Sequence, residues 1–219
     1  MSAIGHGEQD HSHLMDRVYR HQRHFYDLTR RYYLLGRDKL IGELGAERGT
    51  RVLEVGCGTG RNLIRAAELF PEAEFYGMDI SHGMLATARR AAKRQGASVH
   101  LGYGDATRFN PYASFGVSRF ERIYMSYTLS MIPDWQATLA QAICNLAPGG
   151  SLHIVDFGQQ ERLPRWFRSL LRAWLAKFHV SPRGELDRVL HALAERLGAE
   201  LDFTPLYRGY AWYAVLKLP

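Results

Sequence analysis

Residues 52–62 read Val-Leu-Glu-Val-Gly-Cys-Gly-Thr-Gly-Arg-Asn, a short apolar segment that runs into a glycine-rich turn and then into a helical pattern. Glycine lets a backbone turn tightly and approach a ligand closely. Asp79 ends the next apolar segment, where a carboxylate can accept hydrogen bonds from both hydroxyls of a ribose. Together these features predict an adenosine-containing cofactor at the carboxyl edge of a parallel sheet.

The spacing of the glycines distinguishes between adenosine cofactors. A dinucleotide fingerprint that starts at Gly56 requires glycine at position 61, where Arg61 stands, and the sequence has no Gly-x-x-x-x-Gly-Lys-Ser/Thr loop. The pattern Glu-x-Gly-x-Gly-x-Gly at 54–60 instead resembles motif I of the class I S-adenosylmethionine (SAM) methyltransferases. The resemblance implies that SAM is the cofactor and S-adenosylhomocysteine the product. The cationic methionine end of SAM suits an acid such as Glu54.

A second match to this class lies after the third predicted strand, at Gly104-Asp105-Ala106. In the resembled class an acid at this position accepts a hydrogen bond from the adenine amino group, and the next backbone N–H contacts the ring. The residues that we expect to contact SAM are Glu54, Gly56, Cys57, Gly58, Gly60, Asn62, Asp79, Ile80, Asp105, Ala106 and Ser126.

The order of apolar segments predicts an α/β fold. Strands and helices alternate from 51 to 157, which favours a doubly wound parallel sheet. Two closing strands, read as a half-buried hairpin at 200–206 and 209–216, give the Rossmann-like sheet of the resembled class, with seven strands, the last antiparallel, and helices on both sides. We expect a flexible leader at 1–13, an N-terminal helical lid at 14–46, and a SAM-binding domain at 47–219 with a basic amphipathic insertion at 160–183.

Composition limits the classes of function. Hydrophobic residues make up 46% of the 219 residues, enough for a sizeable core. Cys57 and Cys144 belong to no Cys-x-x-Cys or Cys/His cluster, so we expect neither a metal site nor a disulfide, which fits a cytoplasmic location. The sequence shows no signal peptide and no apolar run long enough to span a membrane. The formal net charge of +6 favours anionic partners.

The segment 19–38 reads Tyr-Arg-His-Gln-Arg-His-Phe-Tyr-Asp-Leu-Thr-Arg-Arg-Tyr-Tyr-Leu-Leu-Gly-Arg-Asp. Tyr19, Tyr26 and Tyr33 recur every seven residues and so share one helical face. They either pack in the core or cover the cofactor, where aromatic rings stabilise a nearby cation. The segment resembles the BtaB family, the SAM-dependent N-methyltransferases of betaine-lipid synthesis. The resemblance implies three methylations of the amine of diacylglyceryl-homoserine. It also implies a partner enzyme, an aminocarboxypropyl transferase, that makes this lipid.

The acceptor side is expected to be apolar. The loop Met125–Pro133 lacks the Asn/Asp-Pro-Pro-Tyr/Phe turn of enzymes that methylate base amines, and it suits a small or lipid-like acceptor. No strong base is evident, so Tyr19, Tyr26 or Tyr127 would accept the amine proton or order a water that does. Arg20 or Arg31 would pair with the homoserine carboxylate.

The segment 162–178 has large apolar residues at helical spacing with basic residues interleaved. This pattern is typical of a helix lying on an anionic membrane, and also of a helix packed on a sheet with its arginines in solvent. With the lipid resemblance we favour peripheral membrane contact. The residues assigned to substrate or membrane contact here and in the N-terminal segment are Arg20, Arg31, Tyr33, Arg165, Trp166, Arg168, Arg172 and Trp174.

Three alternatives stay open. Phosphatidylethanolamine N-methylation would use the same cofactor and membrane contact. Carbon or oxygen methylation of a quinone or small metabolite is a second alternative, with His153 or His179 as a base for oxygen. The third is a non-catalytic SAM- or RNA-binding module. We expect no nucleic-acid partner, because the basic residues cluster with large apolar ones.

Overall fold

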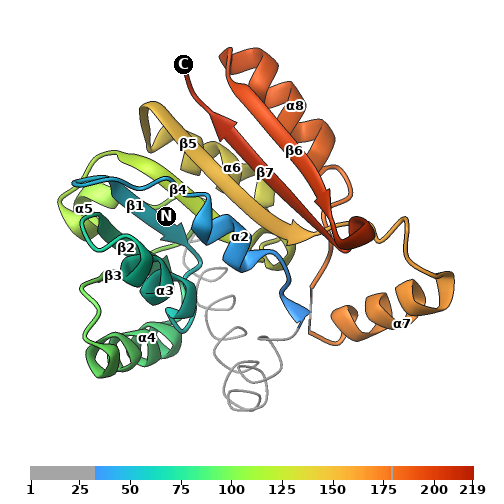
Figure 1. Ribbon diagram of the computed structural model, residues 1–219, viewed down its shortest axis with the longest axis horizontal. Helices are drawn as coiled ribbons and strands as arrows, with labels where there is room; N and C mark the ends of the chain where they lie inside the picture. The colour runs from blue at the N-terminus through green and yellow to red at the C-terminus, as the bar shows by residue number, and fades with distance from the viewer. Residues whose placement is uncertain (1–32, 179) are drawn as a thin grey trace, which may run out of the picture.

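A seven-stranded sheet forms the centre of the protein (Figure 1). The computed structural model describes residues 33–178 and 180–219. The strand order is β3-β2-β1-β4-β5-β7-β6, and β7 runs antiparallel to both β5 and β6, while the other pairs are parallel. This topology confirms the predicted class I methyltransferase sheet. The strands are β1 (Arg51–Val55), β2 (Glu74–Asp79), β3 (His100–Tyr103), β4 (Phe120–Ser126), β5 (Leu146–Phe157), β6 (Glu200–Leu206) and β7 (Ala211–Lys217).

Helices cover both faces of this sheet. Side chains alternate along a strand, so Val52 of β1 packs in one apolar cluster with Leu40 and Leu63, and Leu53 packs in a second cluster with Leu139. Both faces are therefore dry, which explains why the central strands read as nearly continuous apolar runs. The helices are α2 (Arg37–Gly42), α3 (Arg61–Leu69), α4 (His82–Gln95), α5 (Pro111–Phe115), α6 (Trp135–Cys144), α7 (Arg165–Ala176) and α8 (Leu186–Leu197), with 3₁₀ turns η1 (Leu129–Met131) and η2 (Tyr207–Gly209).

The helical segment expected at 14–46 is interrupted at Gly36. Gly36 adopts φ +85°, a left-handed conformation that glycine allows, and the chain turns there before α2 begins; a Cβ at this position would lie 2.9 Å from the Leu206 side chain. Leu40, Ile41 and Leu44 are buried in the core of the domain. These three residues of the expected lid segment therefore pack in the core, and the lid itself stays a prediction. Residues 1–32, which carry the leader and most of the expected N-terminal helix, lie outside the described residues.

The expected closing hairpin is confirmed: β6 and β7 pair antiparallel and are joined by η2. It differs from the expectation in burial, because β7 lies between β5 and β6 and is buried along most of its length. The short helix α5 was not expected; Asn110 caps it by accepting hydrogen bonds from the backbone N–H groups of Tyr112 and Ala113. Within residues 33–178 and 180–219, no helix is both long and apolar enough to cross a bilayer.

Candidate functional site

A cavity of about 500 Å³ lies at the carboxyl edge of the sheet, where β1, β2 and β4 end (Figure 1). Of the eleven residues predicted to contact SAM, all but Gly60 and Asp105 line it. The parallel topology brings these residues together from four separate turns, because the carboxyl ends of parallel strands share one edge.

The turn after β1 requires glycine for steric reasons. Gly56 has φ +74°, and a Cβ on it would lie 2.6 Å from Cγ2 of Thr128. Gly60, at the start of α3, has φ +78° and would place a Cβ 3.0 Å from that of Ala88. The N–H groups of Gly56 and Cys57 both donate to the carbonyl of Met78 at 2.9 Å, which fastens the turn to the end of β2. The cavity floor is therefore bare backbone that a ligand can approach closely.

Asp79 is held by two backbone donors. The N–H of Gly58 donates to Oδ2 at 2.8 Å, and the N–H of Ser81 donates to Oδ1 at 2.9 Å. Each carboxylate oxygen has a second lone pair, so the fixed carboxylate can still accept from two hydroxyl groups. Ser81 also caps α4 by accepting from the N–H of Met84, which fixes the segment that follows. This geometry suits the ribose contact predicted for Asp79.

Glu54 is a buried acid at the base of the cavity, with 1% of its surface exposed. The hydroxyl of Tyr124 donates to Oε2 at 3.1 Å, and Nδ2 of Asn62 donates to Oε1 at 3.2 Å. Burial nevertheless raises the pKa of the Glu54 carboxyl to about 8. A cation bound beside it would favour the ionised form, so this carboxyl is suited to bind a positively charged group.

Arg37 is a site residue that the sequence interpretation missed. It is buried, lines the same cavity, and donates from Nε to the carbonyl of Leu34 at 2.9 Å. Its positive charge lowers the pKa of Glu54, which partly offsets the effect of burial. A guanidinium and a carboxyl in one cavity suit the carboxylate and ammonium of an amino acid. The signal available in the sequence was an arginine directly after the run Tyr-Tyr-Leu-Leu-Gly.

Two buried polar atoms give a further reason why the residues of the cavity fit SAM. Oδ1 of Asn62 and Oγ of Ser126 are buried and lack a hydrogen-bond partner among the described residues, and both side chains line the cavity. Buried polar atoms are normally satisfied, so a polar ligand is expected to reach them. The glycine turn, the acids and these two atoms together match a polar, partly cationic nucleoside.

The side chain of Asp105 is hydrogen-bonded within the turn that follows β3. Its Oδ1 accepts from the backbone N–H and the hydroxyl of Thr107 at 2.9 and 2.8 Å, and Arg108 lies 3.3 Å from Oδ2. Its neighbours Gly104 and Ala106 line the cavity instead. The adenine contact of Asp105 stays a prediction, and the backbone around it forms that part of the wall.

Three apolar side chains, Leu34, Met131 and Ile132, line the cavity together with Tyr127, and we call this part of the wall its apolar end. Tyr127 has φ +57°, and its hydroxyl donates to the carbonyl of Leu35 at 2.5 Å. Burial raises the pKa of this phenol well above its ordinary value. The contact ties β4 to the segment before α2, which gives Tyr127 a structural role; its expected role with the amine proton stays a prediction.

The η1 turn, which carries Met131, is fastened by the segment that follows α7. Arg183 donates from Nε to the carbonyl of Leu129 at 2.9 Å and from Nη2 to that of Ile132 at 2.6 Å. The N–H of Ser181 donates to the carbonyl of Ser130 at 2.8 Å. Buried Asp156 accepts from the N–H of Ser130 at 3.1 Å. The apolar end of the cavity is therefore positioned by chain segments outside the SAM motifs.

The remaining expected residues are placed as follows. Tyr33 meets Trp174 edge-on, with ring centroids 4.6 Å apart, so both aromatic residues pack inward. Arg172 donates to Gln159 and Gln160, and Arg168 is half-buried, whereas Arg165 and Trp166 are exposed. His153 lies buried between Ser151 and Tyr213, outside the cavity lining. Expected residues outside the described part are Tyr19, Arg20, Tyr26, Arg31 and His179.

The arrangement of sheet, glycine turn and acids defines a class I SAM-dependent methyltransferase. Solved structures share the fold. One is a SAM-dependent methyltransferase from Aquifex aeolicus, with 18% identity and a TM-score of 0.62, covering 87% of this chain and 93% of that one. Another is the YcgJ protein from Bacillus subtilis, with 15% identity and a TM-score of 0.64, covering 84% of this chain and 97% of that one.

Residues 46–197 match the family described as a methyltransferase domain, and the chain belongs to that family. Membership confirms SAM as the cofactor. A demethylmenaquinone methyltransferase from a Geobacillus strain is 28% identical over 154 residues, 67% of this chain and 62% of the relative. A demethylmenaquinone methyltransferase from Listeria monocytogenes is 31% identical over 122 residues, which are 55% of this chain and 49% of the relative. The chain thus spans between about half and three-fifths of the length of these relatives.

Proposed function

We propose that this methyltransferase acts on an acceptor carried by a lipid, and that the acceptor group is the amine of diacylglyceryl-homoserine. The observation that carries the proposal is the apolar end of the cavity, lined by Leu34, Met131 and Ile132. Such a surface suits the acyl-bearing side of a lipid better than a polar metabolite. The resemblance of 19–38 to the betaine-lipid enzymes supports the choice of the homoserine amine.

The chain would contribute positioning and desolvation. When bound, SAM supplies an electrophilic methyl group. An aliphatic amine is mostly protonated near neutral pH, and an apolar surrounding disfavours its charged form. The wall of Met131 and Ile132 would thus favour the neutral amine that attacks. Tyr19, Tyr26 or Tyr127 is proposed to order a water that carries the amine proton to solvent, and Arg20 or Arg31 to bind the homoserine carboxylate. Positioning alone is worth several orders of magnitude in rate.

A second candidate is carbon methylation of a prenylated quinone. The curated relatives described above are named demethylmenaquinone methyltransferases, and an isoprenoid tail would suit the same apolar wall. Phosphatidylethanolamine is a third acceptor that shares the amine and the lipid tails. The partner enzyme proposed by resemblance, an aminocarboxypropyl transferase, is expected only with the homoserine lipid.

The test is a competition assay with methyl-labelled SAM and three acceptors in mixed micelles: diacylglyceryl-homoserine, phosphatidylethanolamine and demethylmenaquinone. The Asp79→Ala variant serves as the control with weakened cofactor binding, at a SAM concentration below its raised Kd. The proposal predicts that most label enters the homoserine lipid and that the control transfers much less. Label only in the quinone would replace the proposed acceptor with the second candidate, and label only in phosphatidylethanolamine would replace it with the third.

A further inference from the structure

Helix α7 presents large apolar residues on two sides. Its inner side is packed on the domain through buried Leu171 and Leu175. On another side, Trp166 and Leu170 lie one turn apart and are 70% and 63% exposed. A helix of a globular domain ordinarily buries one apolar stripe and turns polar residues outward. We call Trp166, Leu170 and the small residue Ala173 the outer face of α7.

The η2 turn extends this exposed apolar surface. Tyr207 is 53% exposed, and it and Arg208 adopt positive φ angles of +51° and +62°, which non-glycine residues rarely do. Gly209 of the same turn lies against the carboxylate of Glu161, just before α7. A strained turn therefore carries a second large exposed aromatic residue close to the start of α7.

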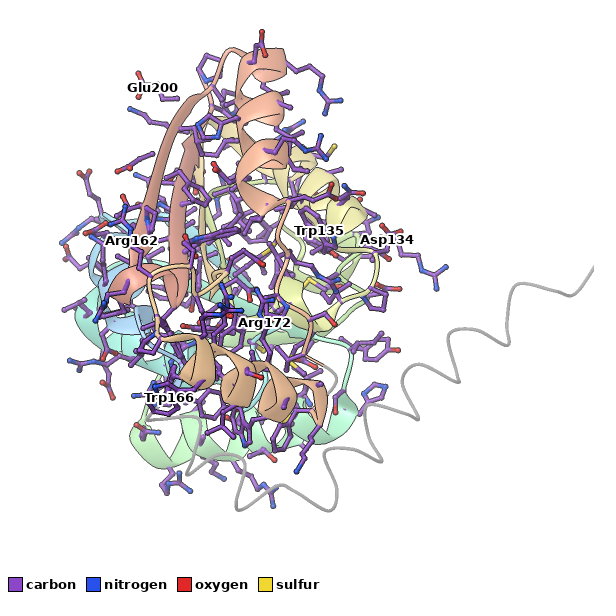
Figure 2. All side chains as sticks on the ribbon, turned by 90° about the vertical axis from the view of Figure 1, so that its right-hand side faces the viewer. Asp134, Trp135, Arg162, Trp166, Arg172 and Glu200 are labelled. Atoms are coloured by element: carbon purple, nitrogen blue, oxygen red, sulfur yellow. The ribbon has the colours of Figure 1, made fainter. Side chains whose placement is uncertain are left out.

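The charge around the outer face is strongly positive. Between Glu161 and Phe178 the chain carries five arginines and lysines and one acid. Arg162, Arg165, Arg172 and Lys177 are exposed, and Arg172 also donates to Gln159 and Gln160 (Figure 2). The exposed cations and aromatic residues form the pattern of helices that lie in the interface of an anionic bilayer.

The location of α7 ties this surface to the cavity. The helix projects beyond the carboxyl edge of the sheet, on the side where the cofactor turn lies (Figure 1). The segment that follows it fastens η1, through the hydrogen bonds of Ser181 and Arg183. A bilayer in contact with α7 would therefore lie near the apolar end of the cavity.

We propose that the outer face of α7 docks on an anionic lipid bilayer, with Trp166 and Leu170 inserted and Arg162, Arg165 and Lys177 against the headgroups. The inference deepens the proposed function, because it names the surface from which a lipid acceptor is drawn. It departs from the expectation that the whole aromatic and basic set touches the membrane, since Trp174 packs on Tyr33 and the guanidinium of Arg172 is hydrogen-bonded to Gln159 and Gln160.

The test measures binding of the full chain to vesicles of phosphatidylcholine with and without phosphatidylglycerol, by flotation. The variant is Trp166→Ala/Leu170→Ala, and the matched control is Leu69→Ala/Tyr112→Ala, which removes two other exposed apolar side chains. Circular dichroism of both variants checks the fold. We expect the first variant to need about tenfold more anionic lipid for half binding, and the control to behave as wild type. Added salt should weaken binding of the wild type.

Tryptophan fluorescence gives an independent readout. Trp135 and Trp212 are buried and Trp174 is half-buried, so Trp166 is the largely exposed one of the four tryptophans. Brominated phosphatidylcholine mixed into anionic vesicles should quench wild-type emission, and Trp166→Phe should bind equally well but lose most of the quenching. Equal quenching in that variant would overturn the proposal.

Other occupants of the outer face would give different results. If wild type self-associates in sedimentation without lipid and Trp166→Ala/Leu170→Ala is monomeric, a second copy of the chain occupies the face and the proposal is wrong. If neither variant alters flotation, another segment docks and the proposal is also wrong. Because flotation requires no catalysis, vesicle docking without methylation of any lipid would refute the proposed function and leave the docking surface standing.

Discussion

The Glu54→Gln substitution tests the electrostatics of the cofactor site. Burial raises the pKa of Glu54 from 4.5 to about 8, which corresponds to about 5 kcal/mol at 1.36 kcal/mol per pH unit. The folded protein holds this proton more tightly than the unfolded chain does. Its contribution to stability is therefore full below pH 4.5 and is lost as the pH rises to 8. Glutamine keeps an oxygen to accept from Tyr124 but does not ionise.

We therefore expect Glu54→Gln to match wild type in free energy of unfolding at pH 4.5, without SAM. At pH 8.5 it should be more stable by roughly 2 to 5 kcal/mol, because the wild type then carries a buried charge. SAM binding should change in the opposite direction. The loss of a charged partner should raise Kd by about tenfold or more at pH 8.

Urea unfolding at the two pH values measures the first effect, and isothermal titration calorimetry measures the second. Glu68→Gln is the matched control, since Glu68 lines the same cavity but is exposed and paired with Arg65 at 3.3 Å. Titration in buffers of different ionisation enthalpy should show that wild type releases a proton on binding SAM at pH 7. If Glu54→Gln retains both the pH dependence of unfolding and the SAM affinity of wild type, the account of this carboxyl is refuted.

Three more predictions concern the sheet edge and the core. Asp79→Ala should weaken SAM binding by roughly 10- to 100-fold in calorimetry, because a charged acceptor is lost; unchanged affinity would remove Asp79 from the site. Gly56→Ala should lower the free energy of unfolding, measured in urea, by roughly 2 to 4 kcal/mol. Gly149→Ala should lower it by about 1 kcal/mol, because Gly149 also has a positive φ but a Cβ there would meet no neighbour. Equal losses in the two variants would contradict the steric argument. Burial lowers the pKa of His153 to about 4, so the free energy of unfolding should fall by up to about 3 kcal/mol as the pH drops from 6.5 to 4. His153→Gln should lose this acid sensitivity. An unchanged pH dependence in the variant would contradict the role assigned to His153.

The sequence alone predicted the sheet and the SAM turn well, and for a local reason. The strand, the turn and Asp79 lie within 28 residues, from Val52 to Asp79, and their spacing is set by backbone geometry that glycine makes visible. The cavity lining confirms that Glu54, Gly56 and Asp79 come together. Steric requirements within one short segment can therefore be predicted from the sequence.

Features that depend on long-range packing were not predictable in this way. The chain turns at Gly36 with φ +85°, and the Leu206 side chain, distant in the sequence, occupies the space that a Cβ there would need. Arg37 is drawn into the cavity by that same turn. The periodicity of apolar residues predicted helix α7. It could not predict which of the aromatic side chains stay exposed, because that depends on the packing of Trp174 on Tyr33. Likewise, β7 is buried on both faces because Trp212 packs in one cluster with residues of α8 and Tyr213 in the other with residues of α2.

The account turns on the identity of the methylated group, so the most direct measurement is the mass of the lipid product. Purified protein would be incubated with diacylglyceryl-homoserine in anionic mixed micelles and with labelled SAM at a concentration below the raised Kd of Asp79→Ala, which is run in parallel. The account predicts a trimethylated homoserine lipid that forms much faster with wild type than with the variant. No methylated homoserine lipid, under conditions in which the same preparation methylates demethylmenaquinone, would contradict it.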